Sequence, residues 1–420
     1  MNQNENVYSV VPNGSNQNRF IHVLKNSAFL KLWISQVLSI VAVHMINFTL
    51  IIQAFELSGK TIAVSFLWIV VALPGILVGM PAGVLSDRWD RKKILVATNF
   101  LQAATILIYL LVLDNLALLY AIAFVNAIIA QTYIPSEAAA LPTIVPKEQY
   151  IAANTIFMLS NIFGFIIGSA LAGPIVAYFN LATPFYVSSV MLLLAGLTVV
   201  FLPSLKPSYE KKFQGVIYTI VSDTVDLWIK IKTKFKLRWA IVRLASVFIV
   251  LAIFAVIFPS FVKNGLGFKV TDLSLFIVVP GGIGFLLGGI IVERLELRIS
   301  KRLLFNSGMI CAGLFIVALS LFSIYPFAKH LPIPQLLMFF LGIFGASVTT
   351  PIQTIIQEEA EEEIRGRVFA LVNFFYISFS ILATLFLGLF ADLIGSKFII
   401  LLVGLSMVVA GSRNFIRRYE

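Results

Sequence analysis

Charged side chains are scarce in this sequence, and their scarcity excludes an ordinary soluble domain. Asp, Glu, Lys and Arg make up 12% of the 420 residues and hydrophobic residues make up 59%, whereas a soluble domain carries roughly 25% charged residues. Runs of roughly 20 apolar residues cross a bilayer, so the composition predicts an all-α membrane protein. We expect twelve spans, at residues 29–56, 62–86, 94–113, 116–137, 151–178, 182–203, 239–262, 271–292, 302–325, 332–357, 366–391 and 396–412.

The chain also lacks the motifs of an enzyme or a nucleotide-driven pump. Its single cysteine, Cys311, lies in an apolar run, so no disulfide can form within the chain. The sequence contains no GxxxxGK[ST] loop, no Cys/His spacing typical of a metal site, and no nucleophile beside a base in an aqueous segment. We therefore expect no catalysis, no cofactor and no bound metal.

The positions of the basic residues predict the orientation of the chain. Lys and Arg are retained in cytoplasmic loops, and all but five of the 31 fall on the side that holds both termini and every second loop. We therefore expect a multi-pass protein of the plasma membrane with both termini in the cytoplasm. The net charge of +11 is spread over short loops beside apolar runs, which favours anionic lipid over nucleic acid as the partner.

Polar segments divide the chain into units. Residues 1–27 start with an Asn- and Gln-rich tract without the basic start of a signal peptide, so we expect a mobile cytoplasmic tail. Residues 204–238 predict a cytoplasmic linker, in which apolar residues at helical spacing indicate an interfacial amphipathic helix, a solvated linker being the alternative. The linker separates two six-helix bundles, 28–203 and 239–412, and residues 413–420 form a second tail.

The two bundles carry the same pattern. At an offset of about 206 residues, five positions of the first half match five of the second, the acid and the arginine included, and parallel repeats of this kind are typical of transporters. The aligned pairs are Pro74 with Pro280, Gly75 with Gly281, Gly83 with Gly289, Asp87 with Glu293 and Arg88 with Arg294.

The segment GVLSDRWDRKK, residues 83–93, closely matches a loop pattern, G-x-x-x-D-R-x-G-R-[RK]. The matching residues are Gly83, Asp87, Arg88, Arg91 and Lys92. This loop resembles the one between the second and third helices of the major facilitator superfamily. The sequence departs from the pattern at one place, where Asp90 replaces a glycine and loses that residue's freedom of positive φ.

Two further segments narrow the resemblance. LPTIVPKEQYIAAN at 141–154 and IRGRVFAL at 364–371 are similar to the macrolide- and enterobactin-exporter branch of that superfamily. The resemblance implies a conformational latch, in which Asp87 meets the start of the eleventh helix near Arg365 and Arg367. Gly289, Glu293 and Arg294 would form the second-half copy. The alternative is that the basic residues of these loops only fix the topology.

Few ionisable groups are expected inside the bilayer, where they are costly and usually functional. By this reading Glu137 lies at a cytoplasmic end, while His44 alone falls near the middle of a span. Related exporters often carry an aspartate in the first helix, but Ala42 and Val43 occupy those positions here. His44 is therefore the candidate proton site, and a neutral histidine satisfied by a neighbouring helix is the alternative.

Polar stripes along the spans are candidates for the wall of a transport cavity. On the first span, Gln36, Ser39, His44 and Asn47 fall within roughly 140° at 100° per residue. Interhelical hydrogen bonding alone would explain such stripes equally well. The other candidates are Asn126 and Gln131 on span four and Thr350, Gln353, Thr354 and Gln357 on span ten. Span seven is almost wholly apolar and carries Phe248, Phe254 and Phe258, which favours hydrophobic cargo.

The interpretation that unites these features is a monomeric secondary transporter in the lipid bilayer. It would export a hydrophobic or amphipathic small molecule by alternating access, in exchange for protons. One alternative is a carrier of lysophospholipid or a lipid-like substrate without proton coupling. A non-transporting membrane receptor or scaffold is the other.

Overall fold

The computed structural model describes residues 16–206, 231–323 and 332–416, and throughout these ranges the regular structure is helical. Twelve helices are long and apolar enough to cross a membrane, as the sequence predicted. The first half contains α1 (Asn16–Lys25), α2 (Ser27–Ser58), α3 (Thr61–Arg88), α4 (Arg91–Ile108), α5 (Leu116–Ala130), α6 (Tyr133–Ile144), α7 (Tyr150–Tyr178) and α8 (Thr183–Val200). The second contains α10 (Phe235–Ser260), α11 (Val279–Glu296), α12 (Lys301–Phe322), α13 (Ile333–Glu359), α14 (Glu362–Ile394) and α15 (Ser396–Ile416).

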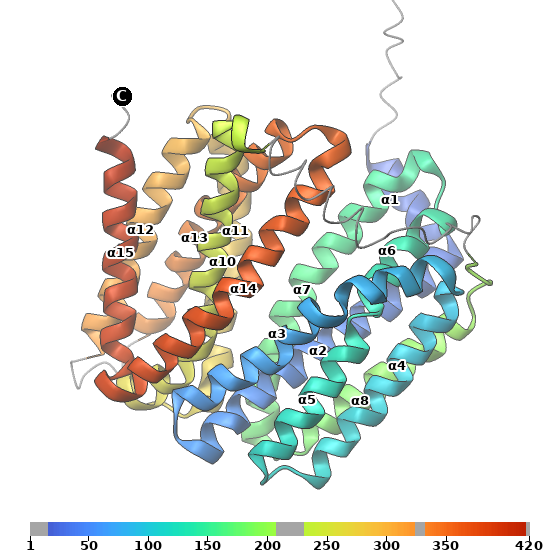
Figure 1. Cartoon of the computed structure of the whole chain (residues 1–420), viewed down its shortest axis with the longest axis horizontal. Coiled ribbons are helices and arrows are strands. Elements are labelled where there is room, and N and C mark those ends of the chain that lie inside the picture. Colours follow the sequence, from blue (N-terminus) through green and yellow to red (C-terminus); the bar gives the residue numbers. More distant parts are fainter. Residues whose placement is uncertain (1–15, 207–230, 324–331, 417–420) are drawn as a thin grey trace, which may run out of the picture.

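The two halves are built by the same helix pairing, which agrees with the repeat in the sequence. In the first half α2 packs on α7, α3 on α5 and α4 on α8. In the second half the equivalent helices pair in the same way, α10 with α14, α11 with α13 and α12 with α15. Figure 1 shows the two bundles side by side, with α3 and α14 crossing where the bundles meet.

Both described ends of the chain lie at one end of the molecule. Helix α1 and the end of α15 lie at the top of Figure 1, and we call this end the terminal face. The turn at 59–60, the connection at 179–182 and residues 261–272 lie at the other end, which we call the opposite face. Residues 261–266 form a π-helical turn that closes α10 with a left-handed cap at Gly267.

Two segments differ from the sequence-based expectation. Residues 16–25, which we placed in a mobile tail, form α1, because Val23 is fully buried against α2 and α7. The fourth span runs to Ile144 and breaks at 131–132 between α5 and α6, so it reaches beyond the predicted end at residue 137. The predicted amphipathic helix of the linker lies mainly in 207–230, outside the described residues.

Candidate functional site

The halves share one hydrophobic core, and it lies toward the opposite face. Met45, Phe48 and Phe55 of α2 belong to the same buried cluster as Phe258 and Phe261, at the end of α10. Toward the terminal face each half has its own cluster instead. One contains Phe29, Leu32 and Leu141 of the first half, and the other contains Leu244, Phe305 and Ile356 of the second. Burial therefore joins the halves at one end and leaves their cores separate at the other.

Two phenylalanines of the seventh span lie inside this shared core. Phe254 and Phe258 stack at 5.1 Å between ring centroids and are 7% and 8% exposed. We had expected them to favour a hydrophobic cavity, but they are packed inside the core that joins the halves. Phe248 lies one turn and a half earlier, edge-on to Tyr376 of α14.

Besides the shared core, the halves meet at two close contacts, which we call seams. Each seam combines a serine of one half or the other with a glycine. In the first seam Ser65 of α3 donates to the Thr384 carbonyl of α14 at 2.8 Å, and a Cβ at Gly388 would lie 2.0 Å from the Ser65 hydroxyl. In the second, Ser274 donates to the Ser169 carbonyl of α7 at 2.8 Å and accepts from the Gly173 amide at 3.0 Å. A Cβ at Gly173 would overlap the Thr271 carbonyl at 2.0 Å. At Gly173 the overlap is with backbone, so glycine is required there, and at Gly388 a Cβ would displace the hydroxyl that makes the Ser65 hydrogen bond.

The first seam ends in a helix cap supplied by the other half. Helix α3 begins after Lys60, whose side chain makes no capping hydrogen bond. Asp392, in the last turn of α14, accepts from the Thr61 amide at 2.7 Å and from the Ile62 amide at 2.9 Å. These are two of the amides that a helix N-terminus leaves without an internal partner, and a carboxylate is favoured there by the helix dipole as well. From the sequence, Asp392 reads only as an acid at the end of a span, and the contact between the halves becomes visible in the structure alone.

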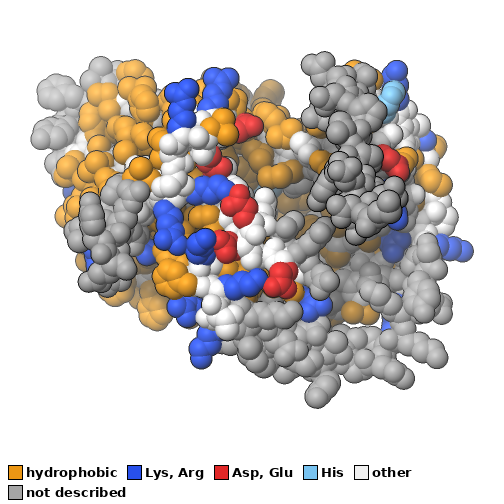
Figure 2. Space-filling model, turned by 90° about the horizontal axis from the view of Figure 1, so that it is seen from above, with side chains coloured by type: hydrophobic (Ala, Val, Ile, Leu, Met, Phe, Trp, Pro, Cys, Tyr) orange, Lys and Arg blue, Asp and Glu red, His pale blue; other side chains and the backbone are white. Residues whose placement is uncertain are grey.

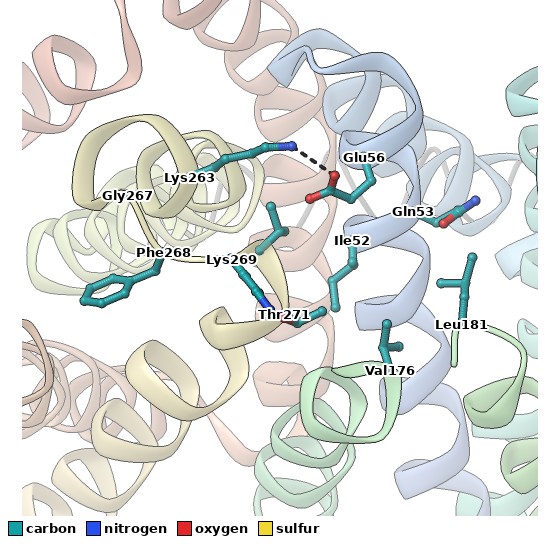
Figure 3. Close-up of a pocket in the computed structure, with 11 residues that line it drawn as sticks. Ile52, Gln53, Glu56, Val176, Leu181, Lys263, Gly267, Phe268, Lys269 and Thr271 are labelled. Atoms are coloured by element: carbon teal, nitrogen blue, oxygen red, sulfur yellow. Dashed lines mark hydrogen bonds and ion pairs between the residues drawn. The ribbon is translucent and has the colours of Figure 1, made fainter. Parts of the chain in front are cut away.

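A pocket of about 550 Å³ lies between the halves at the opposite face. Figure 3 shows Glu56 of α2 and Lys263 reaching toward each other at its rim, where Nζ and Oε2 are 2.9 Å apart. Both side chains are nearly half exposed, and such pairs contribute at most about 1 kcal/mol. The ion pair therefore supplements the core and the seams at this face.

At the terminal face, charged residues brace the second half internally. Figure 2, which looks onto this face, shows basic and acidic side chains interleaved there. Lys234 pairs with Glu361 at 2.8 Å and Lys236 with Glu359 at 3.1 Å, which ties the start of α10 to the connection between α13 and α14. Lys301 at the start of α12 pairs with Glu358.

The predicted latch falls at this face, and the structure describes part of it. The side chains of Asp87 and Arg365 lie outside the described part, so their contact stays a prediction. Arg88, at the end of α3, and Arg367, in the first turns of α14, are exposed. Gly83 lies in open surroundings, where a Cβ would meet nothing within 4 Å.

The other predicted residues of the two loops lie at the surface or partly buried. Glu293 and Arg294 of the second-half copy are exposed on α11, and Gly289 has open surroundings like those of Gly83. Arg91 and Lys92, in the first turn of α4, are partly buried.

Asp90, the departure from the family pattern, has a structural role. Its φ is −62°, so the backbone needs no glycine there. The carboxylate caps α4 by accepting from the Lys92 amide at 3.0 Å, and it binds the Ser204 hydroxyl at 2.7 Å and the Leu205 amide at 3.0 Å. The loop is thereby fastened to the chain that leaves α8.

The polar residues predicted to line one face of the first span contact two different helices, α4 and α7. Gln36 and Ser39 are 1% and 3% exposed and lie inside the first half, where Ser39 donates to Asn99 of α4 at 2.8 Å. His44 points toward α7 instead, edge-on to Phe165 at 5.0 Å. Asn47 is partly buried. Gln36 therefore lies within a bundle and not on an open cavity wall.

Of the remaining cavity candidates, Asn126 is buried on α5 and Gln131 lies at the break after α5, beside Gly75 of α3. The span-ten stripe lies on the side of α13 away from the second-half core. Thr350, Gln353 and Thr354 are partly buried there and Gln357 is exposed.

Sequence reasoning placed Glu137 at a cytoplasmic helix end, but the residue is 8% exposed inside the first half. It faces Gln36 across the α2–α6 contact, with Nε2 and Oε2 3.5 Å apart. The misplacement arose because the fourth span continues past residue 137, and α6 turns residues 133, 136, 137 and 140 inward. The spacing of these four residues was a signal that could have been read from the sequence.

Twelve membrane-crossing helices in two repeated halves are typical of secondary transporters. The sequence model of the Major Facilitator Superfamily matches residues 32–382. The chain therefore belongs to the Major Facilitator Superfamily.

Individual relatives agree with this assignment. The chain is 25% identical over 370 residues to the uncharacterized MFS-type transporter YfiS of Bacillus subtilis, covering 86% of each chain. It is 24% identical over 399 residues to macrolide efflux protein A of Streptococcus pyogenes, covering 90% of this chain and 92% of that one. Among solved structures, the nucleoside transporter NupG matches in fold with a TM-score of 0.72 at 13% identity, covering 94% of this chain and 100% of that one.

The cap across the halves yields a prediction. Asp392→Ala removes both acceptors from the α3 N-terminus, and loss of a capping side chain costs about 1 kcal/mol, which shifts the closed-to-open ratio at the opposite face about fivefold. Spin labels at Phe179→Cys and Leu393→Cys, in a Cys311→Ser background, should report a larger share of long distances. Asp114→Ala removes an exposed acid from the same face and is the matched control. An unchanged distance distribution in Asp392→Ala would contradict the role of the cap.

Asp90 yields a prediction of pH dependence. Burial raises the pKa of its carboxyl, but hydrogen bonds from Ser204, Leu205 and Lys92 and the charge of Lys93 outweigh this and hold the pKa below its ordinary value. A carboxyl with a lowered pKa stabilises the fold fully above its ordinary pKa, about 3.9. That contribution is lost as the pH falls through the lowered value.

We therefore expect Asp90→Ala to lower the free energy of unfolding by about 1 kcal/mol near neutral pH and by progressively less in acid. Thermal unfolding of the purified protein across a pH series measures this difference. Ser204→Ala, which removes one donor, should give a smaller effect of the same pH dependence. A difference between wild type and Asp90→Ala that persists in acid would rule out the carboxylate as its source.

Proposed function

We propose that this chain is a secondary active exporter that moves a hydrophobic or amphipathic small molecule out of the cell in exchange for protons. The observation that carries the proposal is the asymmetry of the cores. The halves share buried surface toward the opposite face and keep separate cores toward the terminal face. A carrier of this kind alternates between a state in which its halves are packed together at one face and a state in which they are packed together at the other.

The orientation follows from charge. In the described ranges the terminal face carries most of the Lys and Arg residues, and such residues are retained in the cytoplasm. We assign the terminal face to the cytoplasm and the opposite face to the outside of a plasma membrane. The cargo class is supported by the likeness to macrolide efflux protein A, whose name gives a macrolide as what it exports.

A lipid-like cargo is the second candidate, and one observation favours it. A groove of about 370 Å³ runs between α1, α2 and α7, and its lining is almost wholly apolar, with Trp33, Val37, Phe163 and Ile167 among its residues. Its polar contact is the hydrogen bond from Trp33 Nε1 to Ser160 at 2.7 Å. Such a groove suits an acyl chain entering from the bilayer.

A transport assay decides between the two. Inverted vesicles containing the protein should accumulate a macrolide or a lipophilic dye when their interior is acidified, and the accumulation should collapse when the pH gradient is removed. Vesicles made without the protein are the baseline. Movement of lysolipid alone, independent of the gradient, would favour the lipid-like candidate, and no movement of any compound would contradict transport.

The loop latch gives a second test of the mechanism. Asp87→Asn removes the charge that we expect to meet the start of α14 when the cytoplasmic side closes, while the basic topology signals remain. We expect normal membrane insertion and slower transport in the vesicle assay. Asp114→Asn, at an exposed position on the other face, should transport like wild type. Equal rates for Asp87→Asn and wild type would refute the latch.

A further inference from the structure

A cluster of buried polar side chains lies between α2, α4 and α6 in the first half. Glu137 of α6 is 8% exposed, and beside it Gln36 of α2 is 1% exposed. Ser136 is fully buried on α6, and Tyr133, one turn earlier, is 8% exposed. Asn99 of α4 continues the cluster through its contact with Ser39. Buried Ser, Thr, Asn and Gln side chains occur in other spans too, but Glu137 is the only Asp, Glu, Lys or Arg buried to this degree among the described residues.

The cluster is not internally satisfied. The contact between Gln36 Nε2 and Glu137 Oε2 is 3.5 Å, at the long limit of a hydrogen bond. Four further buried oxygens have no hydrogen-bond partner within the described part of the chain, namely Glu137 Oε1, Gln36 Oε1, Ser136 Oγ and Tyr133 Oη. Buried polar atoms normally have partners, so this concentration calls for an explanation. The Glu137 and Gln36 oxygens can only accept, and a proton on the Glu137 carboxyl would turn one of these acceptors into a donor.

The surroundings of Glu137 also favour a neutral side chain over an ionised one. Tyr133 is the titratable group that faces it, and α2 presents the uncharged amide of Gln36. Helices α2, α3, α4 and α5 pack against α6, and among their described side chains no Lys, Arg, His or Asp adds a charge at Glu137. An ionised carboxylate at such a place has no cation to balance it, and a buried unpaired charge is costly.

The cluster lies close to the contact between the halves. Helix α6 begins just after the break at residues 131–132, and Gln131 at that break lies beside Gly75 of α3. A Cβ at Gly75 would also touch Ile377 of α14, in the other half, at 3.6 Å. Broken helices at membrane depth are typical of sites that bind the coupling ion. Relative movement of the halves can thus reach α6 through α3 and the break.

We propose that Glu137 is the site at which this carrier binds and releases a proton. With the proton bound, the side chain is a neutral acid that fits the packed first half seen here. Loss of the proton leaves a carboxylate, which is stabilised only if donors or water approach it, and this requires α6 to move relative to α2 and α4. Proton binding would then select between two arrangements of the first half. The inference rests on the proposed proton-coupled export, and it assigns to Glu137 the role that we expected of His44 from the sequence.

The proton site can be tested without transport. Infrared difference spectra of the reconstituted protein, recorded as the pH is stepped, should contain a band from a protonated carboxyl that titrates. Glu137→Gln, which mimics the neutral acid and so preserves packing, should remove the band, and Glu137→Asp should keep it with a shifted midpoint. Glu148→Gln, at an exposed position eleven residues later, should leave it unchanged. A spectrum of Glu137→Gln identical to wild type would overturn the inference.

Transport then tests the coupling. In inverted vesicles, accumulation of a macrolide by Glu137→Gln should become independent of the pH gradient, whereas His44→Gln should remain driven by it. The reverse result, with driven transport lost in His44→Gln and kept in Glu137→Gln, overturns the inference in favour of histidine. If wild type itself shows no effect of the gradient, proton-coupled export is wrong, and the infrared titration still decides whether Glu137 binds a proton.

Discussion

Close helix contact at two glycines is the constraint on which the joined end of the two halves depends. At Gly388 and at Gly173 a helix of one half approaches the other half so closely that a single added carbon would overlap neighbouring atoms. In each seam a serine hydroxyl bridges the helices, and in each it reaches a backbone carbonyl. A contact this close is disrupted by a small displacement of either helix, so it is either made or lost. Such a contact suits a molecule that must have two discrete states.

The remaining interactions at the opposite face are individually weak, and this suits their function. The ion pair between Glu56 and Lys263 is solvated, and the cap from Asp392 replaces hydrogen bonds that water could make once the halves part. The shared core supplies the larger apolar contribution. Its loss on opening has to be offset by burial at the terminal face or by cargo, so the balance between the two states depends on what is bound.

The sequence predicted the class of fold well, because the signals for membrane helices are strong and local. Twelve apolar runs, the distribution of basic residues and the repeat around Gly83 and Gly289 required no knowledge of packing. The role of Asp90 could not be predicted from the local sequence. Asp90 was recognised as a departure from the pattern, but its partners Ser204 and Leu205 follow it by more than a hundred residues, and only the fold brings them together.

The functional residues were harder to predict for the same reason. His44 stood out because it is the one titratable residue in the middle of its span, yet the helix turns it toward Phe165. Glu137 was discounted because hydropathy placed the span's end too early. Asp392 gave no local signal at all. Its role is visible only in the missing cap before α3, since Lys60 stands where a Ser, Thr, Asp or Asn would be expected.

The fastening of the chain at Asp90 has a mechanical consequence for the connection between the halves. The chain is held at Leu205 by the first half, and it is held again where Ile231, 1% exposed, is buried in the second. Each half therefore holds its own end of the connection, through Asp90 in the first half and through the core around Phe305 in the second. Loss of the Asp90 carboxylate would free one end and leave the other anchored, so the two fastenings act independently of each other.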